Sequence, residues 1–585
     1  MNNIVFSFLL SFVSLLIISL FNLSFIYNSA VSSKEIIFLF YCCAIIIALL
    51  CFFAKTKKIS LSYTDLFFLL LCFYISANSS SYKLKTIGIC LFYILGRLVF
   101  SNIHRQISVI ISISLVLFVN LVYGILQYSE ILTTYNSNFP ITGSFFNPAP
   151  YAGFIALGSV FLLYDILHRK KIYSFFRLYS SAKCSKKLTI FVVYFALLSF
   201  ILTIFVLFIS KSRAGLLAFV LSNLFFYASY KKLFKIKYFL FILPTFVLSL
   251  VGLYFVKKDS ANGRLLIWKI SANILPDNFF TGIGTEQFKA KYMLYQADYF
   301  SKKLVQDEFI LADNIVYTFN DLFQFILEQG FIGILLLLLL VCSISKTNKN
   351  SLNLLGISIL FCFSLFGLFS YPTQIIPIEL IAVLGLIFSA FKQKNKFAIK
   401  NHKIFKIIGC IAFLSLFLYF CISCKNKLHA YTQWKKAENL YYQENFTQTI
   451  NVFKEIYPIL KSDGEFLMHY GKTLSLDNQY QKSNNILENA TKYINNTVIQ
   501  TTYGDNYKSL KQYNKAEKHY RLACNMVPNR LYPKYLLVKL YQESNQLNKA
   551  LKEASSLLSV PVKVPSYTTF QIREEMQKFI YEKNN

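Results

Sequence analysis

The sequence predicts an all-α protein in two parts, a polytopic transmembrane bundle of about 12–13 helices followed by a soluble α-solenoid. The first observation is composition, because a chain that is 55% apolar and only 15% charged lies outside the range of soluble globular proteins. The second is a succession of apolar runs up to residue 425. The third is an abrupt change from His429 onward to polar sequence with helical periodicity.

The apolar runs predict membrane spans, because a helix needs roughly 20 apolar residues to cross a bilayer. The predicted spans lie near 4–26, 36–54, 62–77, 84–100, 107–127, 150–167, 188–209, 214–229, 237–256, 323–343, 352–370, 375–391 and 405–424. The first stretch, Met1–Ala30, lacks the basic front end of a signal peptide, so we expect an uncleaved first span.

The basic residues between the spans predict the orientation, because cytoplasmic loops carry an excess of Lys and Arg. With a cytoplasmic N-terminus, nearly every basic cluster falls on the cytoplasmic side. These clusters are Lys55–Lys58, His168–Lys187, Lys231–Lys237, Lys346–Lys349 and Lys392–Lys403. The opposite face then holds Gln127–Pro148, Lys211–Arg213, residues 257–322, Tyr371–Gln374 and everything after residue 424. We expect the chemistry on that face.

Two classes of function are disfavoured by composition. The net charge of +32 is distributed among the loop clusters, which argues against nucleic-acid binding. The twelve cysteines have no paired spacing, and several lie inside apolar runs, where a thiol packs as a small apolar side chain. This argues against a metal site or a disulfide framework.

The C-terminal part contains a repeat with a period of about 34 residues. Its clearest copy, TTYGDNYKSLKQYNKAEKHYRLACNMVPNR, has small, aromatic and proline positions at Gly504, Tyr507, Ala516, Tyr520, Ala523 and Pro528. The pattern resembles tetratricopeptide repeats and implies about four helix pairs over residues 430–564, with 565–585 as a capping helix. Such arrays bind proteins or peptides, so we expect a recognition or assembly module. The alternative is an unrelated helical bundle.

Two arginines stand apart from the cytoplasmic clusters. Arg213, in SKSRAG with Lys211, lies at a turn between spans, and Arg264, in NGRLLIWK, opens the long loop on the same face. Arginine offers a planar fork of donors that matches phosphate oxygens. The pair therefore suggests a polyanionic ligand. The alternative for each is a snorkelling or loop-pairing arginine.

A third motif on that face, FPITGSFFNPAPYAGFIALG, carries Asn147 between glycine and proline residues. This composition favours a tight re-entrant approach to the bilayer, and Asn147 can both donate and accept hydrogen bonds. A plain loop and helix start is the alternative.

A fourth segment, ADNIVYTFNDLFQFILEQG, contains Asp313, Asn320, Asp321 and Glu328. Asp321 and Glu328 are seven residues apart and share one face of a helix that begins by Asp321. An ionisable residue at the edge of a span is by default a functional candidate. The alternative for Glu328 is a hydrogen bond that packs helices.

The order of the four motifs resembles the O-antigen ligase-related family of polytopic glycosyltransferases, which includes O-antigen polymerases and protein O-oligosaccharyltransferases. The resemblance covers roughly residues 60–390, with its diagnostic part in 143–331. It implies transfer of a glycan from a polyprenyl-pyrophosphate carrier to an acceptor hydroxyl outside the cytoplasm, without a metal or nucleotide cofactor. Arg213 and Arg264 match the arginines thought to hold the pyrophosphate. The loop-shaping positions of the family fall at Trp268, Gly282, Gly284 and Phe288.

The chain departs from the family at Phe319, where many ligases carry a His proposed to activate the acceptor hydroxyl. No His occurs between residues 169 and 401. Either a carboxylate serves as the base, or positioning of carrier and acceptor supplies most of the rate. The candidate carboxylates are Glu328, Asp321, Asp313 and Glu286. The departure argues against ligation to lipopolysaccharide core in particular.

The sequence therefore predicts a multi-pass glycan transferase of the bacterial cytoplasmic membrane. Residues 1–425 form the membrane domain, with the large loop 257–322, and residues 430–585 form a periplasmic repeat domain. The arginine pair, Lys211, Asn147 and Asn320 are the candidate substrate-binding residues. The acceptor is a glycolipid or a protein, and a protein partner is expected on the repeat domain. The alternatives are an O-antigen polymerase, a non-enzymatic membrane scaffold and, more weakly, a transporter.

Overall fold

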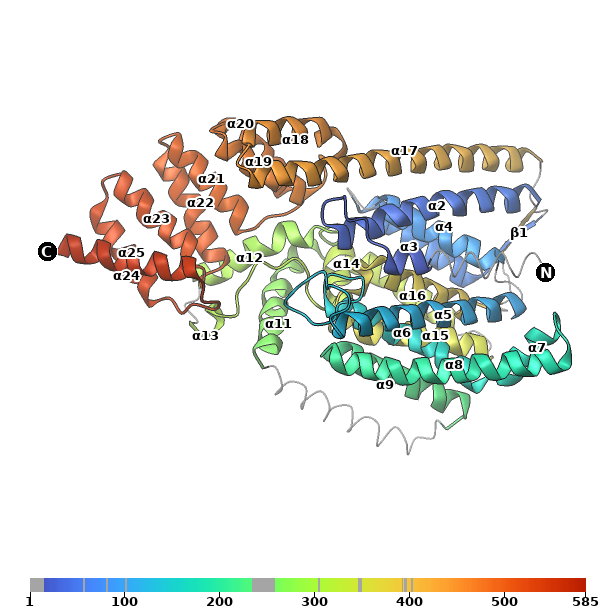
Figure 1. Cartoon of the computed structure of the whole chain (residues 1–585). Helices are drawn as coiled ribbons and strands as arrows, with labels where there is room; N and C mark the ends of the chain where they lie inside the picture. The colour runs from blue at the N-terminus through green and yellow to red at the C-terminus, as the bar shows by residue number, and fades with distance from the viewer. Residues whose placement is uncertain are drawn as a thin grey trace.

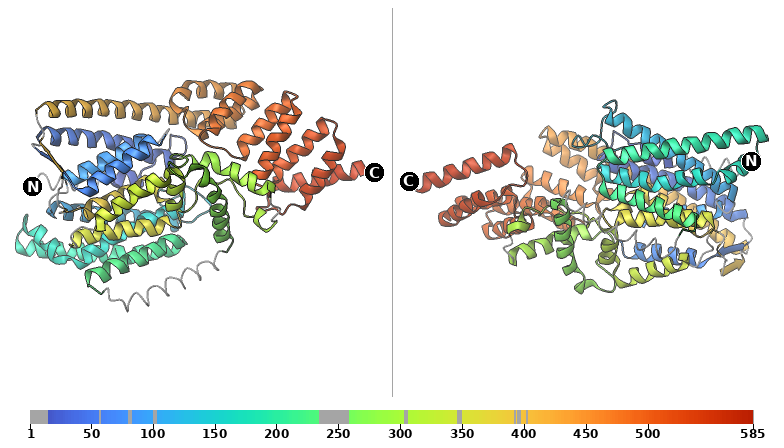
Figure 2. Two further views of the ribbon diagram at one scale, coloured as in Figure 1. Left: turned by 180° about the vertical axis from the view of Figure 1, so that it is seen from behind. Right: turned by 90° about the horizontal axis from the view of Figure 1, so that it is seen from below.

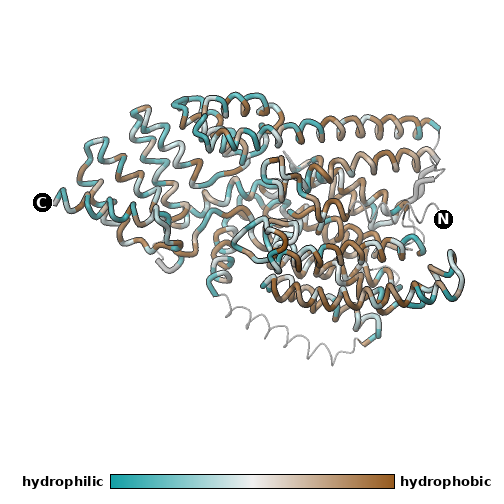
Figure 3. Tube along the Cα trace, in the orientation of Figure 1, coloured by the Kyte–Doolittle hydropathy of each residue, from teal (hydrophilic) through white to brown (hydrophobic). Residues whose placement is uncertain are grey.

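A computed structural model describes residues 15–55, 58–79, 83–99, 103–233, 258–302, 306–345, 350–391, 393, 397–400 and 403–584. The described chain is helical apart from one two-stranded sheet. Apolar helices form a bundle, and a series of helices projects from one end of it (Figure 1; Figure 2). Apolar residues dominate the bundle and polar residues the projecting part (Figure 3). The predicted helical class is confirmed.

Six helices of the described chain are long and apolar enough to cross a bilayer. They are α2 (Ser29–Lys55), α5 (Ile103–Tyr128), α6 (Pro148–Leu167), α8 (Ala182–Ile209), α14 (Asp321–Ser345) and α17 (Lys403–Tyr442). Shorter helices occupy five further predicted spans, namely α3 (Tyr63–Ala77), α4 (Lys83–Val99), α9 (Arg213–Tyr230), α15 (Ser351–Gly367) and α16 (Ile376–Ser389). The predicted span 237–256 and residues 4–14 of the predicted span 4–26 lie outside the described residues. The total of 12–13 spans stays a prediction.

Helix α6 lies at the centre of the bundle and positions the start of its neighbour α9. Almost all of α6 is buried, and small residues let other helices approach it closely. A Cβ on Gly215 of α9 would lie 2.7 Å from the Cβ of Ala152 in α6. Because the two helix starts touch at this point, the residues just before Gly215 lie beside those just before Ala152.

The long α14 is interrupted at Gly330, which has φ +60° and non-helical backbone geometry. The segment 279–285 runs along this break as a partner strand would. The N–H groups of Ile283 and Gly284 donate to the carbonyls of Leu327 and Glu328, at 2.9 and 3.0 Å. Gly282, at φ +73°, passes so close that a Cβ there would lie 2.4 Å from the backbone of Glu328. The predicted glycine motif therefore shapes the loop, as expected.

The long polar loop is itself largely helical. It contains α11 (Lys258–Ser271), two short 3₁₀ turns (Ala272–Ile274 and Pro276–Asn278), α12 (Phe288–Lys302) and α13 (Gln306–Phe309). Its apolar side chains, including Ile270, Phe288 and Met293, form a separate core. Met526 and Val527 of the C-terminal part complete this core, so the loop and the C-terminal helices pack together.

The C-terminal part begins as a continuation of α17, which runs unbroken over 40 residues from the membrane part into the polar part. The predicted boundary at 425–430 therefore lies within one helix. The remaining helices are α18 (Phe446–Leu460), α19 (Gly464–Leu476), α20 (Tyr480–Thr491), α21 (Thr497–Ser509), α22 (Tyr513–Met526), α23 (Leu531–Glu543), α24 (Leu547–Ser559) and α25 (Tyr567–Asn584).

These helices stack in successive pairs that meet at the small residues of the predicted repeat (Figure 1). A Cβ on Gly504 of α21 would lie 2.2 Å from the Tyr520 ring of α22. Gly471 is similarly close to Leu487 between α19 and α20. The tetratricopeptide assignment of these pairs stays a prediction.

The one sheet of the described residues joins two loops that are predicted to be cytoplasmic. Strand β1 (Lys58–Leu61) pairs antiparallel with β2 (Phe397–Lys400). In Figure 1 this sheet and α7 (Arg169–Arg177) lie at the end of the bundle opposite to α11, α12 and the C-terminal helices. The segments predicted to share a face therefore gather at the same end.

Candidate functional site

A pocket with a volume of about 280 Å³ opens at the end of the bundle that bears the large loop. Its lining comes from residues 139–149, 209–214, 260–264, Phe319 and residues 369–371. These segments were predicted from the distribution of basic loops to share one face. The pocket is therefore formed by chain segments that are distant in sequence and meet through the packing of α6, α9 and α14.

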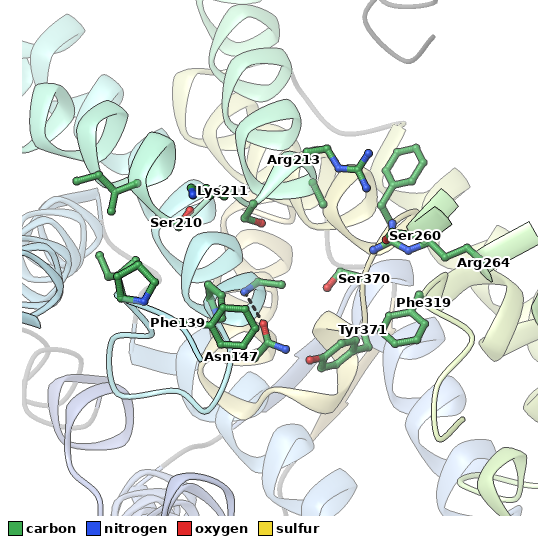
Figure 4. Close-up of a pocket in the computed structure, with 18 residues that line it drawn as sticks. Phe139, Asn147, Ser210, Lys211, Arg213, Ser260, Arg264, Phe319, Ser370 and Tyr371 are labelled. Atoms are coloured by element: carbon green, nitrogen blue, oxygen red, sulfur yellow. Dashed lines mark hydrogen bonds between the residues drawn. The ribbon is translucent and has the colours of Figure 1, made fainter. Parts of the chain in front are cut away.

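One wall of the pocket is cationic (Figure 4). Arg213 is the first residue of α9, after the N-cap Ser212, and Lys211 precedes it in the turn from α8. Arg264 reaches the same wall from α11. Three of the eighteen lining residues are basic and none is acidic. Burial and the nearby charge of Arg213 lower the pKa of the Arg264 guanidinium. The two arginines are thus close enough to share an anionic ligand.

The other wall is aromatic and neutral. The Arg264 guanidinium lies over the ring of Phe319, whose edge meets the ring of Tyr371 at a centroid distance of 5.8 Å. Tyr317 stacks on Tyr371 at 4.6 Å. Ser370 lies beside Tyr371, and both side chains point into the pocket (Figure 4). The sequence analysis placed the Tyr371 turn on this face but did not single out its residues.

Asn147 closes the pocket from the start of α6. Its side-chain oxygen accepts a hydrogen bond from the Ala149 N–H at 3.1 Å, which is an N-cap interaction. The side chain lines the pocket together with Pro148. Asn147 therefore caps the start of a helix, which was the alternative to a re-entrant segment. Its amide group faces the cavity (Figure 4).

Asn320 and the candidate carboxylates are not among the described residues that line the pocket. Asn320 accepts a hydrogen bond from the Phe323 N–H at 3.0 Å and caps α14. Asp321 is buried and accepts from the Thr373 N–H at 2.8 Å. Glu328 is buried and accepts from Gln324 at 3.0 Å.

The other two carboxylates form ion pairs. Asp313 lies 3.1 Å from Arg530 and 3.3 Å from Lys563, both in the C-terminal part. Glu286 pairs with Lys289 of the same loop at 3.5 Å. The four candidate carboxylates, which lie close together in sequence, thus each bind different partners in the fold.

A buried network that the sequence analysis missed supports the Tyr371 turn. Lys85 of α4 donates to the carbonyl of Thr373 at 2.6 Å and forms an ion pair with Glu379 at 2.8 Å. Asp321 binds the N–H of the same Thr373. The backbone N–H and C=O of Thr373 are therefore both held by side chains from α4 and α14, which fixes the turn that contains Tyr371.

The C-terminal helices hold the segment that leads to Phe319. Asn529 donates to the carbonyls of Phe309 and Ala312 at 2.6 and 2.8 Å. Asn314 donates to Thr497 at 3.0 Å. Further along the segment, Trp268 of α11 donates to the carbonyl of Thr318 at 2.9 Å. The chain from residue 309 to the pocket is therefore bound on both sides. Among the described residues no cluster of three or more His, Cys, Asp or Glu side chains could hold a metal ion.

Six bilayer-length apolar helices define this chain as a multi-pass membrane protein. A family model described as O-antigen ligase matches residues 198–338. These 141 residues (198 to 338) are about a quarter of the 585-residue chain, and they include Arg213, Arg264 and Phe319. The match supports a membrane glycosyltransferase that is similar to O-antigen ligases and polymerases. No curated protein sequence matches the chain.

Proposed function

We propose that this protein transfers an oligosaccharide from a polyprenyl-pyrophosphate carrier to an acceptor hydroxyl. The observation that carries the proposal is the convergence of Arg213 and Arg264 in one pocket, where none of the described lining residues is acidic. Both residues lie within the part of the chain that the O-antigen ligase model matches. A pocket with three cations and no carboxylate suits a ligand with several negative charges, such as a pyrophosphate.

The reaction follows from the position of this charge. The acceptor oxygen forms a bond with the anomeric carbon of the glycan, and the bond from that carbon to the pyrophosphate oxygen breaks. The electron pair leaves with the pyrophosphate, so negative charge grows beside Arg213 and Arg264, which stabilise it. The hydroxyl proton passes to solvent or to an oxygen of the departing pyrophosphate, because none of the described lining residues is a carboxylate or an imidazole. We therefore expect positioning and charge neutralisation to supply most of the rate.

The distribution of basic loops supports a bacterial cytoplasmic membrane location with the pocket on the outer side. The C-terminal helices would then lie in the periplasm, where they could receive a protein. The acceptor is a glycolipid sugar or a protein hydroxyl. The C-terminal helices that pack against the large loop favour a protein acceptor or partner.

The proposal is tested by complementation of a deletion strain with Arg213→Ala and Arg264→Ala proteins. Loss of an electrostatic stabiliser of the leaving group should lower glycan transfer on the order of 10²- to 10³-fold. Arg177→Ala is the matched control, because Arg177 lies in α7 at the other end of the bundle and its exposed guanidinium donates to the carbonyl of Ser180. If both pocket variants reach wild-type membrane levels and still restore transfer, the scaffold alternative is favoured.

Product length separates the ligase from the polymerase. A ladder of repeat lengths that collapses to one unit on deletion indicates a polymerase. An unchanged ladder on free carrier lipid indicates a ligase.

A further inference from the structure

The proposed function assigns no role to the neutral wall of the pocket, which is formed by Asn147, Phe319, Ser370 and Tyr371. We propose that this wall binds the pyranose ring of the first sugar on the lipid carrier. The inference rests on the proposed function and assigns the substrate group that adjoins the pyrophosphate.

Neighbouring aromatic side chains and a fixed backbone turn hold the Tyr371 ring in place. Tyr317 covers one face of the ring at a centroid distance of 4.6 Å with an interplanar angle of 14°. Phe319 meets it at 72°, so the ring cannot swing toward the loop. Thr373, two residues on, is held by Lys85 and Asp321. An aromatic side chain fixed in this way is a preorganised platform for the apolar C–H face of a sugar.

Neutral polar groups surround the Tyr371 ring. The Tyr371 hydroxyl points across the cavity toward Asn147, and the Ser370 hydroxyl points into its centre (Figure 4). The Asn147 oxygen is used in capping α6, which leaves its amide N–H₂ facing the pocket. Hydroxyl and amide groups can each donate or accept, as sugar hydroxyls require. Burial raises the pKa of Tyr371, so the group facing the ligand is the neutral phenol.

The neutral wall lies next to the cationic wall of the pocket. The carbon of the Arg264 guanidinium lies 5.6 Å from the centre of the Phe319 ring, so the cationic and neutral walls meet at this pair. A sugar linked directly to a phosphate must lie beside that phosphate. The ring on the neutral wall is therefore expected to be the donor's own first sugar. The cavity volume of about 280 Å³ lies just below the range of about 300–1,000 Å³ for ligand pockets. It suits one ring beside the phosphates, with the longer glycan outside.

The test measures binding of defined carriers to the full-length protein in nanodiscs. The probes are undecaprenyl pyrophosphate without sugar and the same carrier bearing N-acetylglucosamine or galactose. Wild-type protein should bind at least one sugar-bearing carrier more tightly than the bare carrier. Tyr371→Ala should remove that preference without changing the Kd for the bare carrier. Tyr371→Phe keeps the platform and loses one hydrogen bond, so it should weaken sugar-dependent binding by about 3- to 10-fold.

The controls separate this inference from the proposed function. Tyr295→Phe removes a hydroxyl that binds Asp277 on the same loop outside the pocket, and it should bind every probe as wild type does. Arg264→Ala should weaken binding of all the carriers, and unchanged binding there would overturn the pyrophosphate assignment on which the inference rests.

Two results would overturn the sugar assignment while the arginine result stands. One is that wild type binds the three carriers equally. The other is that Tyr371→Phe and Tyr371→Ala leave all carrier affinities unchanged and raise only the KM for the acceptor, which would assign the wall to the acceptor.

Discussion

The guanidinium of Arg264 lies over the ring of Phe319, with 5.6 Å from its carbon to the ring centroid. Phe319 adopts φ +55°, a left-handed conformation that is uncommon for a bulky residue. The backbone around it is held by Trp268 and Gln324, which bind the carbonyl and the N–H of Thr318. The fold thus presents the side chain at position 319 to the arginine pair, whichever side chain stands there.

A histidine at position 319 should therefore add a proton acceptor to the site. His adopts left-handed backbone more readily than Phe. Its ordinary pKa of about 6.5 should be lowered by the adjacent Arg264 charge. The neutral imidazole then predominates at pH 7 and is lost as the pH falls below about 6. We expect Phe319→His to transfer glycan faster than wild type at pH 7, with this gain lost at pH 5.

The measurement is the ratio of variant to wild-type transfer between pH 5 and pH 8, with Phe319→Leu as control. Phe319→Leu lacks a titratable group, so its ratio should be independent of pH. A flat ratio for Phe319→His as well would show that proton removal does not limit the reaction.

Gly282→Ala should detach the loop from the break in α14. Gly282 has φ +73°, and an added Cβ would lie 2.4 Å from the backbone of Glu328. The left-handed conformation alone costs about 1–2 kcal/mol for a residue with a Cβ, and the backbone clash adds to this. We expect lower thermal stability in detergent and faster proteolysis between residues 272 and 287. Gly263→Ala is the control, since a Cβ there meets nothing within 4 Å. Equal stability of the two variants would contradict the packing described for this segment.

Asp321 should act by holding the Tyr371 turn, and amide substitution can test this role. Asp321→Asn keeps an oxygen that can accept from the Thr373 N–H, whereas Asp321→Ala removes it. We expect Asp321→Asn to keep transfer within about tenfold of wild type and Asp321→Ala to lose more, with about 1–3 kcal/mol lower stability. Transfer assays and thermal unfolding of both variants measure this difference. If Asp321→Asn is as inactive as Asp321→Ala while its stability is unchanged, the carboxylate is needed for proton transfer.

The shared face of Arg213 and Arg264 was predictable from sequence because the alternation of spans and basic loops assigns each loop to a side. The contact between Gly215 and Ala152, which brings Asn147 toward the arginines, depends on helix packing that no local pattern encodes. Ser370 and Tyr371 were missed for the same reason. Their turn is short, and only the fold shows that it faces the arginine pair.

The acidic residues were harder to interpret. The spacing of Asp321 and Glu328 correctly predicted a helical segment between them. The spacing could not show that Gln324 would donate a hydrogen bond to Glu328 and the Thr373 N–H one to Asp321. The role of Asp313 was also hidden, because its partners Arg530 and Lys563 lie more than 200 residues later in the chain. Ion pairs between such distant segments leave no periodic signal in the sequence.

The interface between the loop and the C-terminal helices should matter for catalysis through its buried hydrogen bonds more than through its ion pairs. Asn529 is buried and donates to two carbonyls, so Asn529→Ala removes two buried hydrogen bonds, at a cost of about 1–3 kcal/mol. The Phe309 carbonyl still accepts from the Ala312 N–H at 3.2 Å. Asp313 is 47% exposed, so Asp313→Asn should cost no more than about 1 kcal/mol despite breaking two ion pairs. We expect Asn529→Ala to increase hydrogen exchange over residues 309–319 and to lower transfer, and Asp313→Asn to leave both near wild type. The opposite order, with Asp313→Asn inactive and its exchange unchanged, would identify Asp313 as the base and show that the pocket described here is not where the acceptor is activated.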